Sequence, residues 1–189
     1  MIAGHFGFAA IVKSRERSTP LWALMLASVW LDIVFMPLFV AHMESVEPVH
    51  PGYGGLIIHA NYTHSIVGMV ALSAVLGAMF LPRMGRRVAL VIALVSASHW
   101  VLDLVVHRAD MPVLPGNYRN LPYFGFGLWN HPQVAACVEL ALVASGAILY
   151  WRAAMDVSAK AGKDGRLAWL SAAMIAAFGL VVLVLDYTS

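Results

Sequence analysis

The sequence predicts an all-α, polytopic membrane protein: a helix bundle of about five transmembrane helices with an N-terminal half-helix, in a single domain over residues 1–189. Two observations carry this prediction. Of the 189 residues, 61% are hydrophobic and only 12% are charged, whereas a soluble domain has about 45–50% apolar and about 25% charged residues. In addition, five stretches approach the roughly 20 apolar residues that a helix needs to cross a bilayer.

The five predicted spans cover residues 20–42, 63–82, 87–106, 132–151 and 167–186. The apolar stretch 2–12 is too short to cross a bilayer, and we interpret it as a half-helix that begins inside the membrane. The connections 43–62 and 107–131 are rich in Pro, Gly and aromatic residues. Both are longer than ordinary helix–helix loops, so we expect them to be functional or partly re-entrant.

The distribution of lysine and arginine predicts the orientation. Of the 12 basic residues, only Arg108 and Arg119 fall in connections on one side of the predicted spans, and the others share the opposite side. Because cytoplasmic loops carry an excess of Lys and Arg, we predict a protein of the cell inner membrane with its N-terminus cytoplasmic and its C-terminus outside. The net charge of +2 is too small to indicate nucleic acid. The expected partners are the lipid bilayer, a lipid-like small-molecule substrate, and further copies or a partner subunit.

Ionisable side chains inside the spans are candidates for function, because each costs roughly 2.5–3.5 kcal/mol to insert. In "SHWVLDLVVH", His99, Asp103 and His107 are spaced i, i+4, i+8, which places them on one helix face. A histidine and a carboxylate one turn apart can aim at one divalent metal ion. Other His and Asp residues are expected at a matching depth in the outer half of the membrane. The metal-ligand candidates are His5, Asp32, His64, His99 and Asp103.

Several short motifs follow one another over roughly the first 115 residues: "GHFGFAA" at 4–10, "LDI" at 31–33, "HANYTHS" at 59–65, "SHWVLD" at 98–103 and "MPVLPG" at 111–116. In this order they resemble the YdjM-like family of predicted membrane-bound metal-dependent hydrolases, the LexA-regulated inner-membrane type. The resemblance implies hydrolase activity and a metal site, and it adds His59 to the candidates above. Val34 and Ala60 stand where the family has a second Asp and an Arg, and the missing carboxylate favours a single bound ion.

The expected activity is metal-assisted hydrolysis of a lipid-like or amphiphilic ester at the outer side of the membrane. Zinc is the default ion for His and Asp ligands, and Mn or Fe suits the same ligands. The candidates for the general base are His59, His107 and Glu139, and the sequence does not choose among them. Two alternatives of other classes stay open: a transporter or proton/metal conduit, and a non-catalytic membrane partner subunit with a structural polar or metal cluster.

Three local expectations complete the interpretation. Pro37 removes the hydrogen bond to the Ile33 carbonyl and is expected to kink the first span. Thr63 or Asn61 is expected to cap the second span. The polar residues of the first outer loop are expected to be solvated; they are His42, Glu44, Glu47 and His50.

Overall fold

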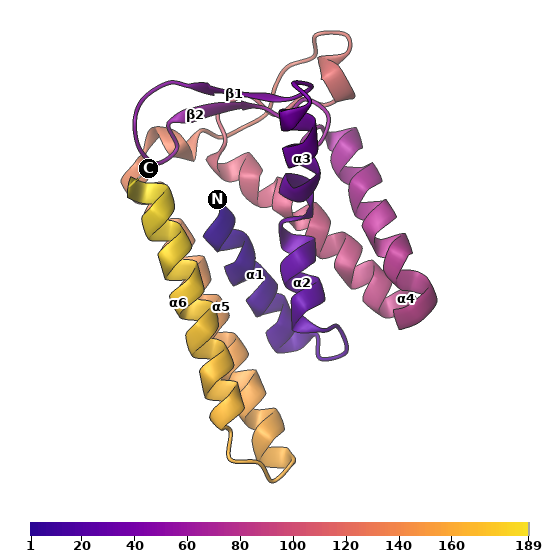
Figure 1. The fold of residues 1–189 in the computed structure, drawn as a ribbon, viewed down its shortest axis with the longest axis vertical. Coiled ribbons are helices and arrows are strands. Elements are labelled where there is room, and N and C mark those ends of the chain that lie inside the picture. Colours follow the sequence, from indigo (N-terminus) through magenta and orange to yellow (C-terminus); the bar gives the residue numbers. More distant parts are fainter. Residues whose placement is uncertain (189) are drawn as a thin grey trace.

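The computed structural model describes residues 1–188 and consists of six α-helices, two short 3-10 helices and one β-hairpin (Figure 1). The α-helices are α1 (Ile2–Arg15), α2 (Leu21–Ser28), α3 (Trp30–Val40), α4 (Ile66–Val106), α5 (Pro132–Lys160) and α6 (Arg166–Thr188). The strands are β1 (Ser45–Pro48) and β2 (Leu56–His59), and the 3-10 helices are Pro115–Asn117 and Leu128–Asn130.

Three helices, α4, α5 and α6, are long and apolar enough to cross a membrane. The bent pair α2 and α3 makes a fourth candidate if it is counted as one span. The helical class and the apolar helices of the prediction are therefore confirmed. The predicted count of five is not confirmed, because residues 66–82 and 87–106 of two predicted spans both belong to the single 41-residue helix α4.

Helix α4 folds back on itself in the middle. Gly85 has a non-helical backbone with φ 79° and ψ 171°, in a region that glycine enters without a Cβ clash. The hydroxyl of Ser73 before this point donates to the Ser96 hydroxyl beyond it, at 2.9 Å. A Cβ on Gly77 would lie only 2.8 Å from the Ala89 carbonyl oxygen. The two arms of α4 thus pack along each other, as Figure 1 shows.

The first predicted span is broken at Val29 rather than at Pro37. Helices α2 and α3 meet there at 46°, and Val29 has φ −120° and ψ 16°. Pro37 lies inside α3 without ending it. A tertiary contact holds α3 in its new direction, because the Trp30 indole N–H donates to the Leu72 carbonyl of α4 at 3.2 Å. The sequence could not show this contact.

The N-terminal stretch forms α1, which packs between α5, α2 and α6. Two glycines let α1 and α5 approach closely. A Cβ on Gly7 would lie 2.6 Å from the Leu142 carbonyl oxygen, and a Cβ on Gly146 would lie 2.3 Å from the Gly7 carbonyl oxygen. Small residues of this kind are typical of close helix contacts in membrane proteins. This close contact sets the position of the first turn of α1 along α5.

The connection 43–62 corrects the purely helical prediction, because it contains the hairpin. Strands β1 and β2 pair antiparallel, with Val46 opposite Ile58. The hairpin lies across one end of the molecule, above the N-terminus of α1 and beside the end of α3 (Figure 1). It forms a roof of paired backbone over this end.

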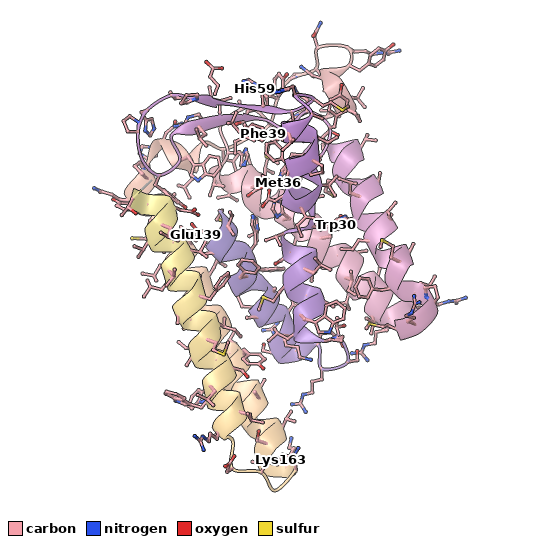
Figure 2. All side chains as sticks on the ribbon, in the orientation of Figure 1. Trp30, Met36, Phe39, His59, Glu139 and Lys163 are labelled. Atoms are coloured by element: carbon pink, nitrogen blue, oxygen red, sulfur yellow. The ribbon has the colours of Figure 1, made fainter. Side chains whose placement is uncertain are left out.

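The opposite end gathers the basic connections. Arg17, after α1, forms an ion pair with Asp156 of α5 at 2.9 Å. Arg87, next to the bend of α4, forms one with Glu16 at 2.9 Å. Figure 2 places Lys163 at this end and His59 at the hairpin end. The three basic segments that the charge pattern assigned to one side therefore lie at one end of the molecule.

Candidate metal centre

Four imidazoles and two carboxylates converge below the hairpin. The Nε2 atom of His99 lies 2.9 Å from Asp103 Oδ2 and 3.4 Å from Asp32 Oδ1. The Nε2 atom of His64 lies 3.5 Å and 3.6 Å from the same two oxygens and 3.2 Å from Nε2 of His99. Nε2 of His5 lies 3.1 Å from Asp103 Oδ1. The structure thus brings all five predicted metal ligands to one place.

The break at Val29 builds part of this centre. Because α2 ends at Ser28, the Ser28 carbonyl belongs to the last turn, whose acceptors have no partner within the helix. It accepts a hydrogen bond from Nδ1 of His99 at 2.8 Å. The same break starts α3 at Trp30, so Asp32 lies in its first turn. A carboxylate is stabilised there by the helix dipole.

The Ser28 contact fixes the tautomer of His99. A carbonyl oxygen can only accept, so Nδ1 must carry the proton, and Nε2 of the neutral ring presents a lone pair to the centre. Such second contacts orient the histidine ligands of metal sites. His99 is also stacked on His5, with ring centroids 3.8 Å apart.

A buried relay orients His64 in the same way. Nδ1 of His64 lies 2.9 Å from the Thr63 hydroxyl, which lies 3.1 Å from both carboxylate oxygens of Glu44. An ionised carboxylate only accepts, so Thr63 donates to Glu44 and accepts from Nδ1–H of His64. Glu44 also accepts from the backbone N–H groups of Tyr62 and Thr63, both at 2.8 Å. The expectation of a solvated Glu44 is wrong, because its residue is only 2% exposed.

His107 joins the centre at its edge. Its Nε2 atom lies 3.7 Å from Asp103 Oδ2, and its Nδ1 atom donates to Asp110 Oδ1 at 2.9 Å. The second oxygen of Asp110 accepts from the Ile58 backbone N–H of β2 at 3.1 Å. Asp110 therefore couples the orientation of His107 to the hairpin. The sequence analysis did not name Asp110, and its position three residues after His107 is the signal that could have indicated it.

The other two candidates for a general base lie apart from this cluster. His59, on β2, has its Nε2 atom 3.3 Å from Glu47 Oε2, and its side chain is partly exposed. Glu139, on α5, is buried and accepts from the Gly4 backbone N–H at 2.9 Å and from the Tyr53 hydroxyl at 2.6 Å. Glu139 thus satisfies a first-turn donor of α1 and ties the hairpin loop to the bundle.

The helix that carries His99 is capped differently from the expectation. The cap of α4 is Ser65, whose hydroxyl accepts from the Gly68 N–H at 2.9 Å, and Thr63 serves the Glu44 relay instead. His64 precedes the helix, and its backbone carbonyl accepts from the Trp100 indole at 2.7 Å. His64 and His99 therefore each have an anchor outside the cluster, whereas Nδ1 of His5 has no hydrogen-bond partner among the described residues.

A cavity of about 530 Å³ leads to the cluster. Asp32, His64, Asp103 and His107 form its wall at the cluster, and His50 and Asp186 are polar lining residues elsewhere. The rest of the lining is largely apolar and includes Phe35 and Met36 of α3, Leu56 and Ile58 of the hairpin, and Trp129. Clefts of roughly 300–1,000 Å³ with a few convergent polar groups are typical ligand sites.

The fold and the centre together define a helical protein with membrane-type helices and a buried His/Asp cluster that could hold a metal ion. Comparison of this chain with family models, with curated proteins and with solved structures finds no match.

Proposed function

We propose that this protein is a membrane-embedded, metal-dependent hydrolase of a lipid-like or amphiphilic ester. The proposal rests on one observation: the Nε2 atoms of His64 and His99 face each other at 3.2 Å and share two carboxylates. In their neutral forms both rings carry their proton on Nδ1, so two lone pairs and two negative charges would meet at the inner end of the cavity. Such an arrangement is costly unless a metal ion lies between the groups or a ring takes up a proton, and a metal ion contacts all four groups at once.

The distances fit a divalent ion. Four ligand atoms at about 2.0–2.2 Å around a tetrahedral zinc ion lie roughly 3.3–3.6 Å from one another. The contacts of His64 and His99 with each other and with the two carboxylates run from 2.9 to 3.6 Å. Two ligand groups can be drawn, His5–His99–Asp103 and Asp32–His64–His99, and both use His99. One nitrogen lone pair binds one ion, which supports a single ion, with zinc as the first choice and Mn or Fe as alternatives.

A bound ion would polarise the ester and activate a water molecule. Of the three candidates for the general base, the geometry favours His107, because it lines the cavity, belongs to neither ligand group and is hydrogen-bonded to Asp110. In this scheme Nε2 of His107 takes a proton from water as the water oxygen bonds to the ester centre. The bond to the leaving oxygen then breaks, and His107 returns the proton to that oxygen, so that one water yields an acid and an alcohol.

We further infer that each arm of α4 is a span, which with α2–α3, α5 and α6 gives five. The protein would lie in the inner membrane of the cell. Its basic end would face the cytoplasm, and the hairpin and the C-terminus would lie outside. The short helix α1 would be the half-helix that presents His5 at the depth of Asp103. This arrangement supports a substrate that is approached from the outer side.

Metal analysis of the purified protein, combined with hydrolysis of a fluorogenic amphiphilic ester, tests the proposal. The wild type should hold one tightly bound ion per chain and hydrolyse the ester. His107→Gln should keep the ion and lose about 10²–10⁴-fold in rate, and His99→Ala should lose the ion. The exposed His131, changed to Ala, is the matched control and should alter neither. A wild type without metal and without activity would support the structural-subunit alternative, and ion flux in proteoliposomes without hydrolysis would support the conduit.

A further inference from the structure

We infer that the substrate is a bilayer lipid that enters the site sideways from the outer leaflet, between α3 and α6, beneath the hairpin. This inference rests on the proposed function and deepens it, because it replaces an amphiphile arriving from water with a lipid whose chains stay in the membrane. It follows from three properties of the cavity: its roof, its open side and the position of its polar wall.

The roof is tethered on the side that faces water. The Tyr53 hydroxyl in the hairpin loop donates to Glu139 of α5 at 2.6 Å. The Ile58 N–H of β2 donates to Asp110 at 3.1 Å. The guanidinium of Arg108 donates to the carbonyls of Gly54 and Leu56. These hydrogen bonds join β2 and the loop between β1 and β2 to the rest of the protein. Entry through the roof therefore requires several of them to break together.

The side between α3 and α6 is built differently. Helix α3 packs against α4 and α2, whereas α6 packs against α5 and α1. Figure 1 shows that α3 and α6 stand on opposite sides of the N-terminus of α1, with the hairpin above them. Residues of all these elements line the cavity, among them Met36 of α3 and Asp186 of α6. The cavity therefore lies beneath the hairpin with α3 and α6 at its two sides, and the exposed lining residues Ile2 and Met36 show that it reaches the surface between these helices.

The side chains around this opening suit acyl chains. Met36 is 54% exposed and Leu56 is 41% exposed, and both line the cavity. Asp32 alone among the five metal-ligand candidates keeps a partly exposed side chain, at 38%. The rim on the α3 and β2 side is apolar, with Asp32 behind it, and Asp186 lies on the α6 side. This rim matches a lipid whose chains lie along α3 while its ester reaches the centre.

Narrowing the rim at Met36 tests this route. In vesicles that contain a fluorogenic phospholipid ester, Met36→Trp should lower lipid hydrolysis at least tenfold. It should leave the metal content within twofold of the wild type, and it should lower the hydrolysis of a short-chain water-soluble ester less than that of the lipid. The matched control is Met79→Trp, because Met79 is also an exposed methionine, on α4, and does not line the cavity. Unchanged lipid hydrolysis in Met36→Trp would overturn the lateral route.

A second measurement needs no turnover and separates this inference from the proposed function. A photoactivatable phosphatidylcholine placed in the outer leaflet should label the cavity-lining segments 35–36 and 56–58 of the wild type, and Met36→Trp should reduce that labelling several-fold. If Met36→Trp loses both activities, or if the wild type hydrolyses neither ester, this labelling decides the route. Labelling that is absent from these segments overturns lateral entry, while the metal analysis still judges the centre.

Discussion

His64 and His99 point their Nε2 atoms at each other across 3.2 Å. One ring is held from behind by the Ser28 carbonyl and the other by Thr63 and Glu44. Neither ring can turn its nitrogen away without losing a buried hydrogen bond, so the centre is organised before any ion arrives. Substitutions of the residues that hold the two rings, such as Glu44, therefore test the centre as well as substitutions of the histidines do.

Glu44→Gln should weaken metal binding by about 10–100-fold, the usual effect of removing a second contact of a histidine ligand. The charge that receives the Thr63 proton is lost, and the tautomer of His64 is no longer fixed. Competition with a chelator measures the affinity. Glu47→Gln, on the same hairpin, removes an exposed partner of His59 and should leave the affinity unchanged. Equal affinities in the two variants would contradict the relay.

Glu139→Ala should destabilise the protein by roughly 1–3 kcal/mol, because it leaves the Gly4 N–H and the Tyr53 hydroxyl without their acceptor. Tyr53→Phe removes only one of the two bonds and should cost less. Thermal unfolding in detergent gives the order of the two variants. If Glu139 were instead the general base, Glu139→Gln would abolish ester hydrolysis without moving the unfolding midpoint.

Gly7→Ala should cost about 1–3 kcal/mol of stability, as overpacking does. The added Cβ would meet the Leu142 backbone at 2.6 Å, and backbone within a helix cannot move aside cheaply. The displacement of α1 should also lower the metal affinity, because α1 carries His5. Gly4→Ala is the control, since its Cβ meets only side-chain atoms, the nearest being Cγ of Met1 at 3.0 Å. Similar unfolding midpoints for both variants would argue against the close α1–α5 contact.

The ion pair at the basic end predicts a loss of stability in acid. The hydrogen bond from Ser18 and the contact with Arg87 lower the pKa of Glu16 to about 2. Since the folded pKa lies below the unfolded one, this stabilisation is complete above about pH 4.5 and fades as the pH falls toward 2. Glu16→Gln should lower stability by roughly 1 kcal/mol at pH 7, because Arg87 is well exposed. The difference between variant and wild type should shrink between pH 4.5 and 2, as unfolding midpoints at each pH would reveal; a constant difference would contradict it.

The orientation is tested by labelling single cysteines in intact cells. The exposed native Cys137 is first replaced by Ala. A cysteine at Glu47, on the hairpin, should react with an impermeant maleimide from outside, and one at Lys160, at the end of α5, should react only after the cells are opened. Outside labelling of position 160 would reverse the proposed topology.

The sequence by itself determined the helical class, the apolar helices and the residues of the cluster. Burial in a membrane demands long apolar helices, and ionisable side chains are so costly there that the few present stand out. The i, i+4, i+8 spacing placed His99, Asp103 and His107 on one face, because local helix geometry sets that relation. Apolar segments and the spacing of residues within one helix are local properties of the chain, so the sequence alone can show them.

Only the tertiary structure decided how those residues are oriented. The break at Val29, the burial of Glu44 and the cap supplied by Glu139 depend on partners far along the chain, such as Leu72 and Gly4. The hairpin likewise needs Asp110 and Glu139 to hold it over the cavity. A local pattern cannot specify such contacts, because their free energy arises only when distant segments pack and leave each buried polar group its partner.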